Sequence, residues 1–209
     1  DFENTFKMLE GDAFSNTSIQ KEYWLKVEQA SVSTVFRGQL CLSGWFPTES
    51  LAVMGNHAGF GVGGGIQRKR LHGLLAIQAF FGESSSTRTV LHEDSLYLSD
   101  AFTYVSISLD FGYSIWEGGR SNVEILGGFG YGGLKVLEVP NPIDRDNPET
   151  VYRNSILANA GLSFRYDLPV GTYYRFSAKY NYSNFNNEPA TDLSGGFISV
   201  EIALGLISQ

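Results

Sequence analysis

The chain has 209 residues, a formal net charge of −7, 18% charged and 14% aromatic residues, and one cysteine. This length fits a single domain, and the composition is neither that of a disordered chain nor that of a disulfide scaffold. The acidic balance argues against a nucleic-acid partner, because phosphate binding depends on clustered Lys and Arg. No apolar run approaches the roughly 20 residues of a membrane-spanning helix, whereas a membrane-spanning strand needs only about 9 to 11.

Residues 1–30 are ambiguous. The stretch IQKEYWLKVEQ is compatible with an amphipathic helix that has Ile19, Tyr23, Trp24 and Val27 on one face, and also with a further alternating strand. We therefore separate residues 1–30 from residues 31–209, which we take as one domain.

From residue 32 onward, apolar residues recur at every second position, which is typical of strands with two different faces. In residues 58–67, for example, Ala58, Phe60, Val62 and Ile66 alternate with glycines. Eight segments show this alternation, the first least regularly: 32–46, 58–67, 71–82, 103–116, 123–131, 156–166, 174–182 and 198–206. The pattern predicts an all-β protein.

The connections between these segments alternate strictly between long and short. PTESLAVMGN, SSSTRTVLHEDSLYLSDA, VPNPIDRDNPET and NNEPATDLSGG are long, whereas RKR, EGGRS and PVGT are short. An antiparallel up-and-down meander gives this alternation when one rim of a closed barrel carries elaborate loops and the other tight turns.

The two faces of the strands indicate where lipid lies. The non-apolar face is rich in Gly, Ser, Ala and Asn, which fits a narrow filled interior better than a solvated exterior. The apolar face exceeds the few hundred Å² that soluble monomers tolerate in water. We expect the inward charges to pair, because buried ions persist mainly when paired; they are Asp110, Glu124, Asp167 and Glu201 with Arg37, Arg165, Arg175 and Lys179.

Aromatic residues gather near the strand ends, as in the girdles of transmembrane barrels. The expected girdle residues are Trp45, Phe46, Phe102, Tyr104, Tyr113, Trp116, Tyr152, Tyr166, Tyr173, Tyr174, Phe185 and Phe197.

From about residue 32 to 209, the strand pattern, loop alternation and aromatic positions resemble the small eight-stranded outer-membrane barrels of the OmpA and OmpX type. The resemblance implies an antiparallel up-and-down eight-stranded transmembrane β-barrel in the outer membrane of Gram-negative bacteria. It also implies that the termini, the short turns and residues 1–30 are periplasmic, and that the long loops lie outside. Such barrels usually end in Phe or Trp, whereas this sequence ends in ALGLISQ, so either the natural chain continues past Gln209 or its terminal signal is unusual.

Two stretches match the dinucleotide pattern G-x-G-x-x-G, through Gly59, Gly61 and Gly64 and again at 128–133. A nucleotide loop needs a helix directly after the glycines, and neither stretch opens one. We interpret the alternating glycines Gly59, Gly61, Gly63 and Gly65 as the inward face of a tight barrel, where they leave room for bulkier neighbours such as Arg165 or Tyr104.

The histidines are the best candidates for catalysis. His57 and His72 are predicted to face inward at opposite ends of neighbouring strands, too far apart to share a site. His92 lies in a long predicted loop with Glu93 and Asp94, and Ser84, Ser85 and Ser86 are near in sequence. This grouping is a thin basis for a Ser–His triad, and a solvated loop histidine is the simpler interpretation.

Two further features have simple interpretations. Asp144, Asp146, Asn147 and Glu149 offer oxygen ligands of the kind calcium prefers, but they lack the glycine and spacing of an EF-hand loop. Cys41 falls on the inward face, where a thiol is inert. We predict no catalytic, cofactor-binding or metal-binding residues and no cofactor.

The expected function is that of a non-enzymatic outer-membrane barrel with a side-chain-filled interior, either a structural and interaction protein or an accessory subunit of an outer-membrane complex. Its expected partners are outer-membrane lipid and other outer-membrane or periplasmic proteins. The alternative is a barrel enzyme that acts on lipid or peptide at its rim.

Overall fold

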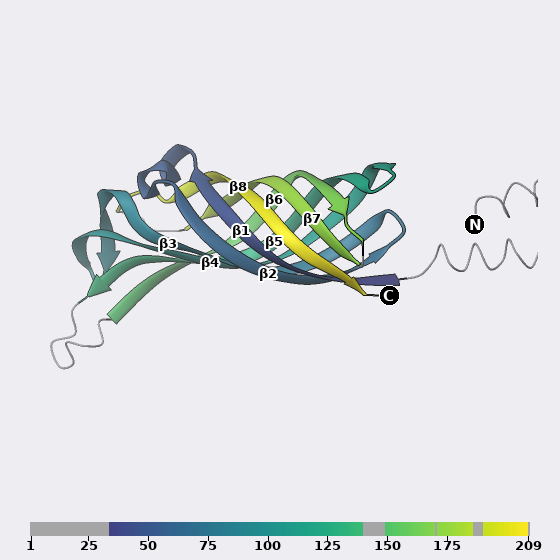
Figure 1. Ribbon diagram of the computed structural model, residues 1–209. Helices are drawn as coiled ribbons and strands as arrows, with labels where there is room; N and C mark the ends of the chain where they lie inside the picture. The colour runs from purple at the N-terminus through teal and green to yellow at the C-terminus, as the bar shows by residue number, and fades with distance from the viewer. Residues whose placement is uncertain (1–33, 140–148, 170, 186–189, 209) are drawn as a thin grey trace, which may run out of the picture.

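The computed structural model describes residues 34–139, 149–169, 171–185 and 190–208. Eight antiparallel strands follow one another around a closed barrel, and the last strand pairs with the first (Figure 1). The strands are β1 (Thr34–Pro47), β2 (His57–Arg68), β3 (Leu71–His92), β4 (Ser95–Gly118), β5 (Ser121–Val139), β6 (Glu149–Asp167), β7 (Thr172–Asn184) and β8 (Ser194–Ser208). A short 3-10 helix, η1 (Glu49–Met54), connects β1 to β2.

The predicted fold class, an antiparallel up-and-down eight-stranded transmembrane β-barrel, is confirmed. The predicted segment 1–30 lies outside the described residues, and so does Val32. None of the described segments forms a helix that is long and apolar enough to cross a membrane.

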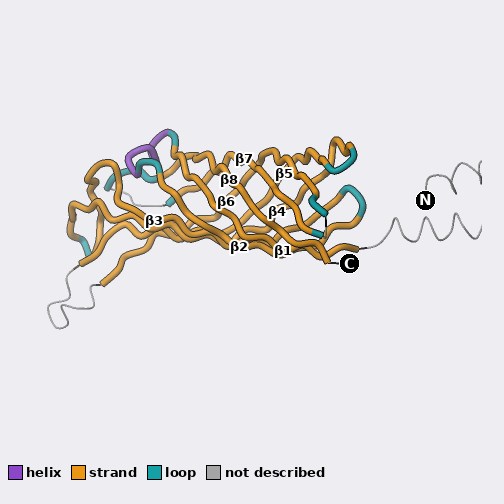
Figure 2. The backbone as a smooth tube through the Cα atoms, in the orientation of Figure 1, coloured by secondary structure: helices purple, strands orange, loops and turns teal. Residues whose placement is uncertain are grey.

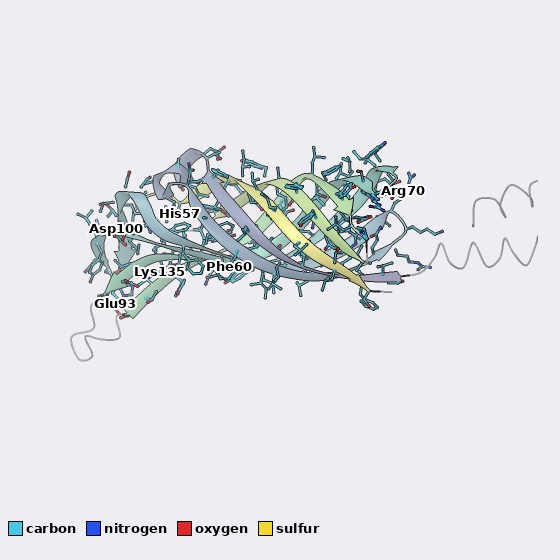
Figure 3. The ribbon with its side chains drawn as sticks, in the orientation of Figure 1. His57, Phe60, Arg70, Glu93, Asp100 and Lys135 are labelled. Carbon is cyan, nitrogen blue, oxygen red and sulfur yellow. The ribbon has the colours of Figure 1, made fainter. Side chains whose placement is uncertain are left out.

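The two rims of the barrel differ, as Figure 2 shows. One rim, here called the turn end, carries the tight connections Lys69–Arg70, Gly119–Arg120 and 168–171, and β1 begins and β8 ends there. The other rim, the hairpin end, carries η1, the tip of the β3–β4 hairpin, the end of β5 and the start of β6. Figure 3 places Arg70 at the turn end and Glu93, Asp100 and Lys135 at the hairpin end.

The prediction of a long loop over residues 84–101 is wrong. β3 and β4 continue as a paired hairpin to a two-residue turn at Glu93 and Asp94, which both have positive φ angles of 45° and 59°. Positive φ at both central residues is what a tight hairpin turn requires. Aspartate tolerates that conformation better than glutamate does, so the turn was hard to predict from sequence.

The outer wall of the barrel is apolar, as the alternation predicts. Leu40 and Leu42, for example, are 68% and 71% exposed, whereas Gln39, Cys41 and Ser43, which alternate with them, are buried. On β4 the outward apolar residues run from Val105 to Trp116. Those eleven steps at about 3.3 Å, tilted by roughly 40°, rise about 28 Å, close to the apolar band of about 25 Å in outer-membrane barrels.

Half of the predicted aromatic girdle is wrong. The correctly predicted outward aromatics are Phe46, Tyr113, Trp116, Tyr152, Tyr166 and Tyr174, whereas Trp45, Phe102, Tyr104, Tyr173, Phe185 and Phe197 are buried inside the barrel. Neighbouring residues of a strand point to opposite faces, so Tyr173 and Tyr174 cannot both face lipid.

Gly59, Gly61, Gly63 and Gly65 of β2 face inward as predicted, and the structure identifies what packs against them. A Cβ atom on Gly59 would lie 2.6 Å from the Phe80 ring, and one on Gly61 would lie 2.9 Å from the Cys41 sulfur. The neighbours suggested from the sequence were different, since Tyr104 packs against Gly132 instead. The glycine stretch therefore allows β2 to lie close to β3 and β1, as a narrow barrel requires.

Candidate functional site

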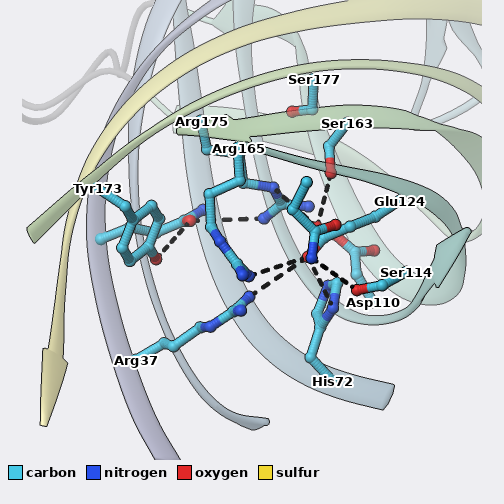
Figure 4. Close-up of polar contacts among 12 residues, drawn as sticks. Arg37, His72, Asp110, Ser114, Glu124, Ser163, Arg165, Tyr173, Arg175 and Ser177 are labelled. Carbon is cyan, nitrogen blue, oxygen red and sulfur yellow. Dashed lines mark hydrogen bonds and ion pairs between the residues drawn. The ribbon is translucent and has the colours of Figure 1, made fainter. Parts of the chain in front are cut away.

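The interior at the turn end is organised around Glu124, whose side chain is fully buried (Figure 4). Its Oε1 atom lies 3.1 Å from Nη1 of Arg165 and 3.6 Å from Nη1 of Arg37. The remaining contacts are with Arg175 at 4.0 Å, His72 at 3.5 Å and the Ser163 hydroxyl, which donates a hydrogen bond at 2.7 Å. We call these six residues the Glu124 cluster; it holds one carboxylate among three guanidinium groups.

A second ionic group lies farther along the barrel, around the buried Lys179. Its Nζ lies 2.9 Å from Oδ2 of Asp110 and 2.8 Å from Oε1 of Glu201. The amides of Asn159 and Gln78 donate hydrogen bonds to the same two carboxylates, at 2.8 and 2.9 Å. Each buried charge of this Lys179 cluster thus has an oppositely charged partner within the barrel, which is the condition under which buried ions persist.

Both clusters follow from strand alternation. All eight charged side chains that the sequence predicted to face inward take part in these clusters or in the adjoining pair between Arg165 and Asp167, whose atoms lie 2.8 Å apart. They come from β1, β4, β5, β6, β7 and β8. The prediction that the inward charges pair is confirmed.

Toward the hairpin end the interior becomes apolar. Trp45 is fully buried there, and its ring centroid lies 4.9 Å from Phe102, 6.2 Å from Tyr104 and 5.3 Å from Phe197. η1 contributes Leu51 and Met54 to the same core, which we call the apolar plug. Ionic clusters and apolar plug together fill the barrel with side chains, as an eight-stranded barrel allows.

The three histidines lie in separate places. The His57 ring stacks on Phe102 at 3.6 Å and its Nε2 atom lies 2.8 Å from the Met54 carbonyl oxygen, whereas His72 belongs to the Glu124 cluster. His92 ends β3, where its Nε2 atom lies 3.6 Å from Oε1 of Glu149 and its ring is 6.2 Å from Tyr97.

The serines grouped with His92 by sequence are not brought to it. The Ser85 hydroxyl donates to the Val53 carbonyl oxygen at 2.9 Å, and the Ser84 hydroxyl accepts from Arg88. These serines precede His92 by several residues of extended strand, a separation on the order of 20 Å. The interpretation of His92 as a solvated loop histidine is also wrong, because the His92 side chain is only 17% exposed.

The remaining candidates are placed as follows. Cys41 is buried and faces inward, and the Ser43 hydroxyl lies 3.7 Å from its sulfur. Asp144, Asp146 and Asn147 lie outside the described residues, while Glu149 begins β6. Among the described residues, no group of three or more His, Cys, Asp or Glu side chains could hold a metal ion.

The two G-x-G-x-x-G stretches lie within β2 and β5.

Sequence reasoning missed Arg88, which is only 2% exposed although it lies in a predicted loop. Its guanidinium donates to the carbonyl oxygens of Ala101 and Val136, and so links the β3–β4 hairpin to β5. Val90, Val136 and Val151 belong to the same buried apolar core as Trp45, Leu51 and Met54 of the apolar plug. The alternating sequence TRTVLH was the signal that β3 continues this far.

No protein-family model and no curated protein matches the sequence. Solved structures match in fold. Neisserial surface protein A aligns over 83% of this chain and 95% of its own at 12% identity, with a TM-score of 0.53. A major outer membrane protein from Thermus thermophilus aligns over 84% of this chain and 100% of its own at 10% identity, with a TM-score of 0.56. The chain therefore has the fold of the small eight-stranded outer-membrane barrels, and its apolar wall accordingly lies in the outer membrane.

Proposed function

We propose that this outer-membrane barrel is a non-enzymatic interaction protein that binds a protein partner through the tip of its β3–β4 hairpin. The observation that carries the proposal is a pair of exposed leucines beyond the lipid-facing band. Leu96 and Leu98 are 64% and 76% exposed. Short turns of outer-membrane barrels face the periplasm, so the hairpin end and these leucines lie outside the cell.

The position of the leucines along β4 separates them from the membrane. Leu98 precedes Val105 by seven residues, or about 23 Å of extended strand. The outward residues from Val105 to Trp116 already span the hydrocarbon, so the leucines extend into water. Apolar side chains that face water in this way are typical of a protein interaction surface.

The hairpin presents these leucines on a supported surface. One face of the hairpin tip carries Val90, which is fully buried, and Tyr97, which packs partly against the same core. Leu96 and Leu98 lie on the opposite face, opposite Leu91 and Thr89 of β3. Guanidinium groups of Arg88 and Arg153 hydrogen-bond to Val136 and Leu91 respectively, and these bonds join the two hairpins. A surface held in this way loses little conformational entropy when a partner binds.

Other features support a non-enzymatic role. The interior is filled with paired charges and packed aromatic rings, and His92 contacts Glu149 and Tyr97 while Ser84 and Ser85 make contacts elsewhere. These contacts favour a function at the outer surface over chemistry inside the barrel.

Site-specific photo-crosslinking in cells of the native host tests the proposal. A photoreactive amino acid in place of Leu98 should form adducts with another polypeptide, and the same probe in place of the lipid-facing Val105 should not. Adding Leu96→Ser should reduce the adducts from position 98, whereas Thr87→Ala, at another exposed position of the hairpin, should leave them unchanged. Adducts from position 105 with no protein adduct from position 98 would show that partners bind through the wall, and the proposal would be wrong.

A further inference from the structure

The turn end of the barrel carries three consecutive cations, Arg68, Lys69 and Arg70, in a chain whose net charge is −7. All three side chains are exposed. Among the described residues, none of the three has an ion-pair partner. An unpaired basic cluster at a membrane boundary requires an explanation, because anionic lipid surfaces attract such clusters.

A cavity of about 450 Å³ lies at this cluster, lined by Arg68, Lys69, Arg70, Leu71 and Tyr113. Arg68 lies directly opposite Leu71 in the β2–β3 pairing, and Leu71 lies opposite Tyr113 in the β3–β4 pairing. Leu71 and Tyr113 are 63% and 42% exposed on the lipid-facing wall. The cavity therefore combines apolar wall on one side with cations on the other.

The backbone of this turn is held in place by its neighbours. The side-chain amide of Gln67 donates a hydrogen bond to the backbone carbonyl oxygen of Lys69 at 2.8 Å. The backbone N–H of Ser114 donates to the backbone carbonyl oxygen of Arg70 at 2.9 Å. The second bond ties the turn to β4, the strand that carries Tyr113. The cations thus project from a fixed position beside the wall.

We propose that this cavity binds an anionic glycerophospholipid, with its phosphate against Arg68 and Arg70 and an acyl chain along Leu71 and Tyr113. Guanidinium groups pair well with phosphate oxygens, because their parallel N–H donors match the phosphate geometry. Tyrosine and tryptophan rings favour the headgroup level of a bilayer. Trp116, which is 52% exposed, lies three residues beyond Tyr113 at that level.

Arg68 distinguishes this cavity from the mouth of the barrel. Lys69 and Arg70 also border the mouth, together with Glu117 and with Asp167, whose carboxylate lies 2.8 Å from Arg165. Arg68 lines the outer cavity, beside Leu71 and Tyr113, and does not line the mouth. A ligand that contacts both Arg68 and the apolar wall must itself be partly apolar, which favours a lipid over a soluble anion.

The test uses fluorescence of Trp116 in vesicles with a Trp24→Phe variant of the full chain, since the only other tryptophan, Trp45, is fully buried. The lipid is phosphatidylcholine that contains equal fractions of either brominated phosphatidylglycerol or brominated phosphatidylcholine. Brominated phosphatidylglycerol should quench Trp116 more strongly than brominated phosphatidylcholine does. Its association constant, relative to that of phosphatidylcholine, should rise about fivefold for each cation that contacts the phosphate.

Two substitutions provide the comparison. Arg68→Gln should weaken the preference about fivefold, and Arg68→Gln with Arg70→Gln should nearly abolish it. Arg120→Gln removes the same charge from the adjacent turn, outside the cavity lining, and should preserve the preference. Equal quenching by the two brominated lipids, or equal losses in Arg68→Gln and Arg120→Gln, would overturn the proposal.

Soluble glycerol 3-phosphate separates lipid from free phosphate as the ligand. It carries the phosphate chemistry without acyl chains, and we expect millimolar amounts to leave the quenching by phosphatidylglycerol unchanged. Loss of the preference at that concentration would show that the site takes a soluble anion and that the lipid assignment is wrong.

Discussion

The Nζ atom of Lys179 on β7 lies 2.9 Å from Oδ2 of Asp110 on β4, three strands away around the barrel. The same ammonium group lies 2.8 Å from Glu201 on β8. One cation thus links β4 to the neighbouring strands β7 and β8 and is the shared ion-pair partner of two buried carboxylates. Such an arrangement makes the barrel depend on Lys179 more than on any single surface ion pair.

Lys179→Met should therefore destabilise the folded barrel by about 3–5 kcal/mol, because it leaves two buried carboxylates without a counter-ion. Urea unfolding in lipid vesicles measures the change. The triple variant Asp110→Asn, Lys179→Met, Glu201→Gln removes all three charges and should recover most of the loss. An unchanged urea midpoint in Lys179→Met would contradict the stabilising role assigned to the ion pairs of Lys179 with Asp110 and Glu201.

Two adjacent glycines of β2 should respond differently to the same substitution. A Cβ atom on Gly65 would lie 2.0 Å from the Gly73 carbonyl oxygen, whereas one on Gly64 has no neighbour closer than 3.9 Å. Gly65→Ala should lower stability by about 1–3 kcal/mol, the usual cost of overpacking, and Gly64→Ala should be nearly neutral. The urea midpoints of both variants provide the measurement, and similar midpoints would show that β2 does not lie this close to β3.

Loss of Arg88 should loosen the hairpin tip and leave the barrel intact. Arg88→Met removes the donors to the Ala101 and Val136 carbonyl oxygens, at a cost of about 1–3 kcal/mol for buried acceptors left unpaired. Limited proteolysis should then cut within the tip, while the urea midpoint of the barrel stays the same. Lys135→Met, which breaks the more exposed pair with Glu138, is the control and should remain uncut.

Asp192 gives a pH-dependent contact at the hairpin end. The hydroxyl and amide N–H of Ser194 donate to its carboxylate at 2.7 and 2.8 Å, and the Ser50 hydroxyl donates at 3.0 Å. These bonds lower the pKa of Asp192 from its usual 3.8. Because the folded pKa is the lower one, the contact is fully present above the unfolded pKa and is lost as pH falls through the folded value.

A carbon-13 titration of the Asp192 carboxyl group should accordingly show a midpoint below 3.8. Ser194→Ala removes the strongest contribution and should move the pKa upward, and Ser50→Ala should move it less. A midpoint at or above the usual value in the unmodified protein would mean that the hydroxyl groups do not donate to this carboxylate in solution.

The sequence by itself determined the barrel, its two unequal rims and the identity of the inward charges. Alternation with period 2 is a local property, so residues such as Arg165 and Glu124 could be assigned to the interior without knowledge of their partners. The lipid-facing wall followed in the same way from Leu40, Phe60 and Val62. Alternation does not give the distance between inward side chains of different strands. That distance depends on the stagger between strands and on how the sheet closes into a barrel.

Only the tertiary structure showed which strands extend beyond the membrane and which aromatics turn inward. The register of β3 against β4 shifts between Glu83 and Arg88, so the outward positions change from odd numbers at Val105 to even numbers at Leu98. Across this shift β4 has one extra residue, Asp100, so its inward positions change there, whereas β3 has four extra residues and keeps Arg88 and Val90 inward like Phe80. A short sequence carries little sign of such an irregularity. The basic cavity at Arg68 likewise required closure, since its lining comes from β2, β3 and β4 and the turn between them.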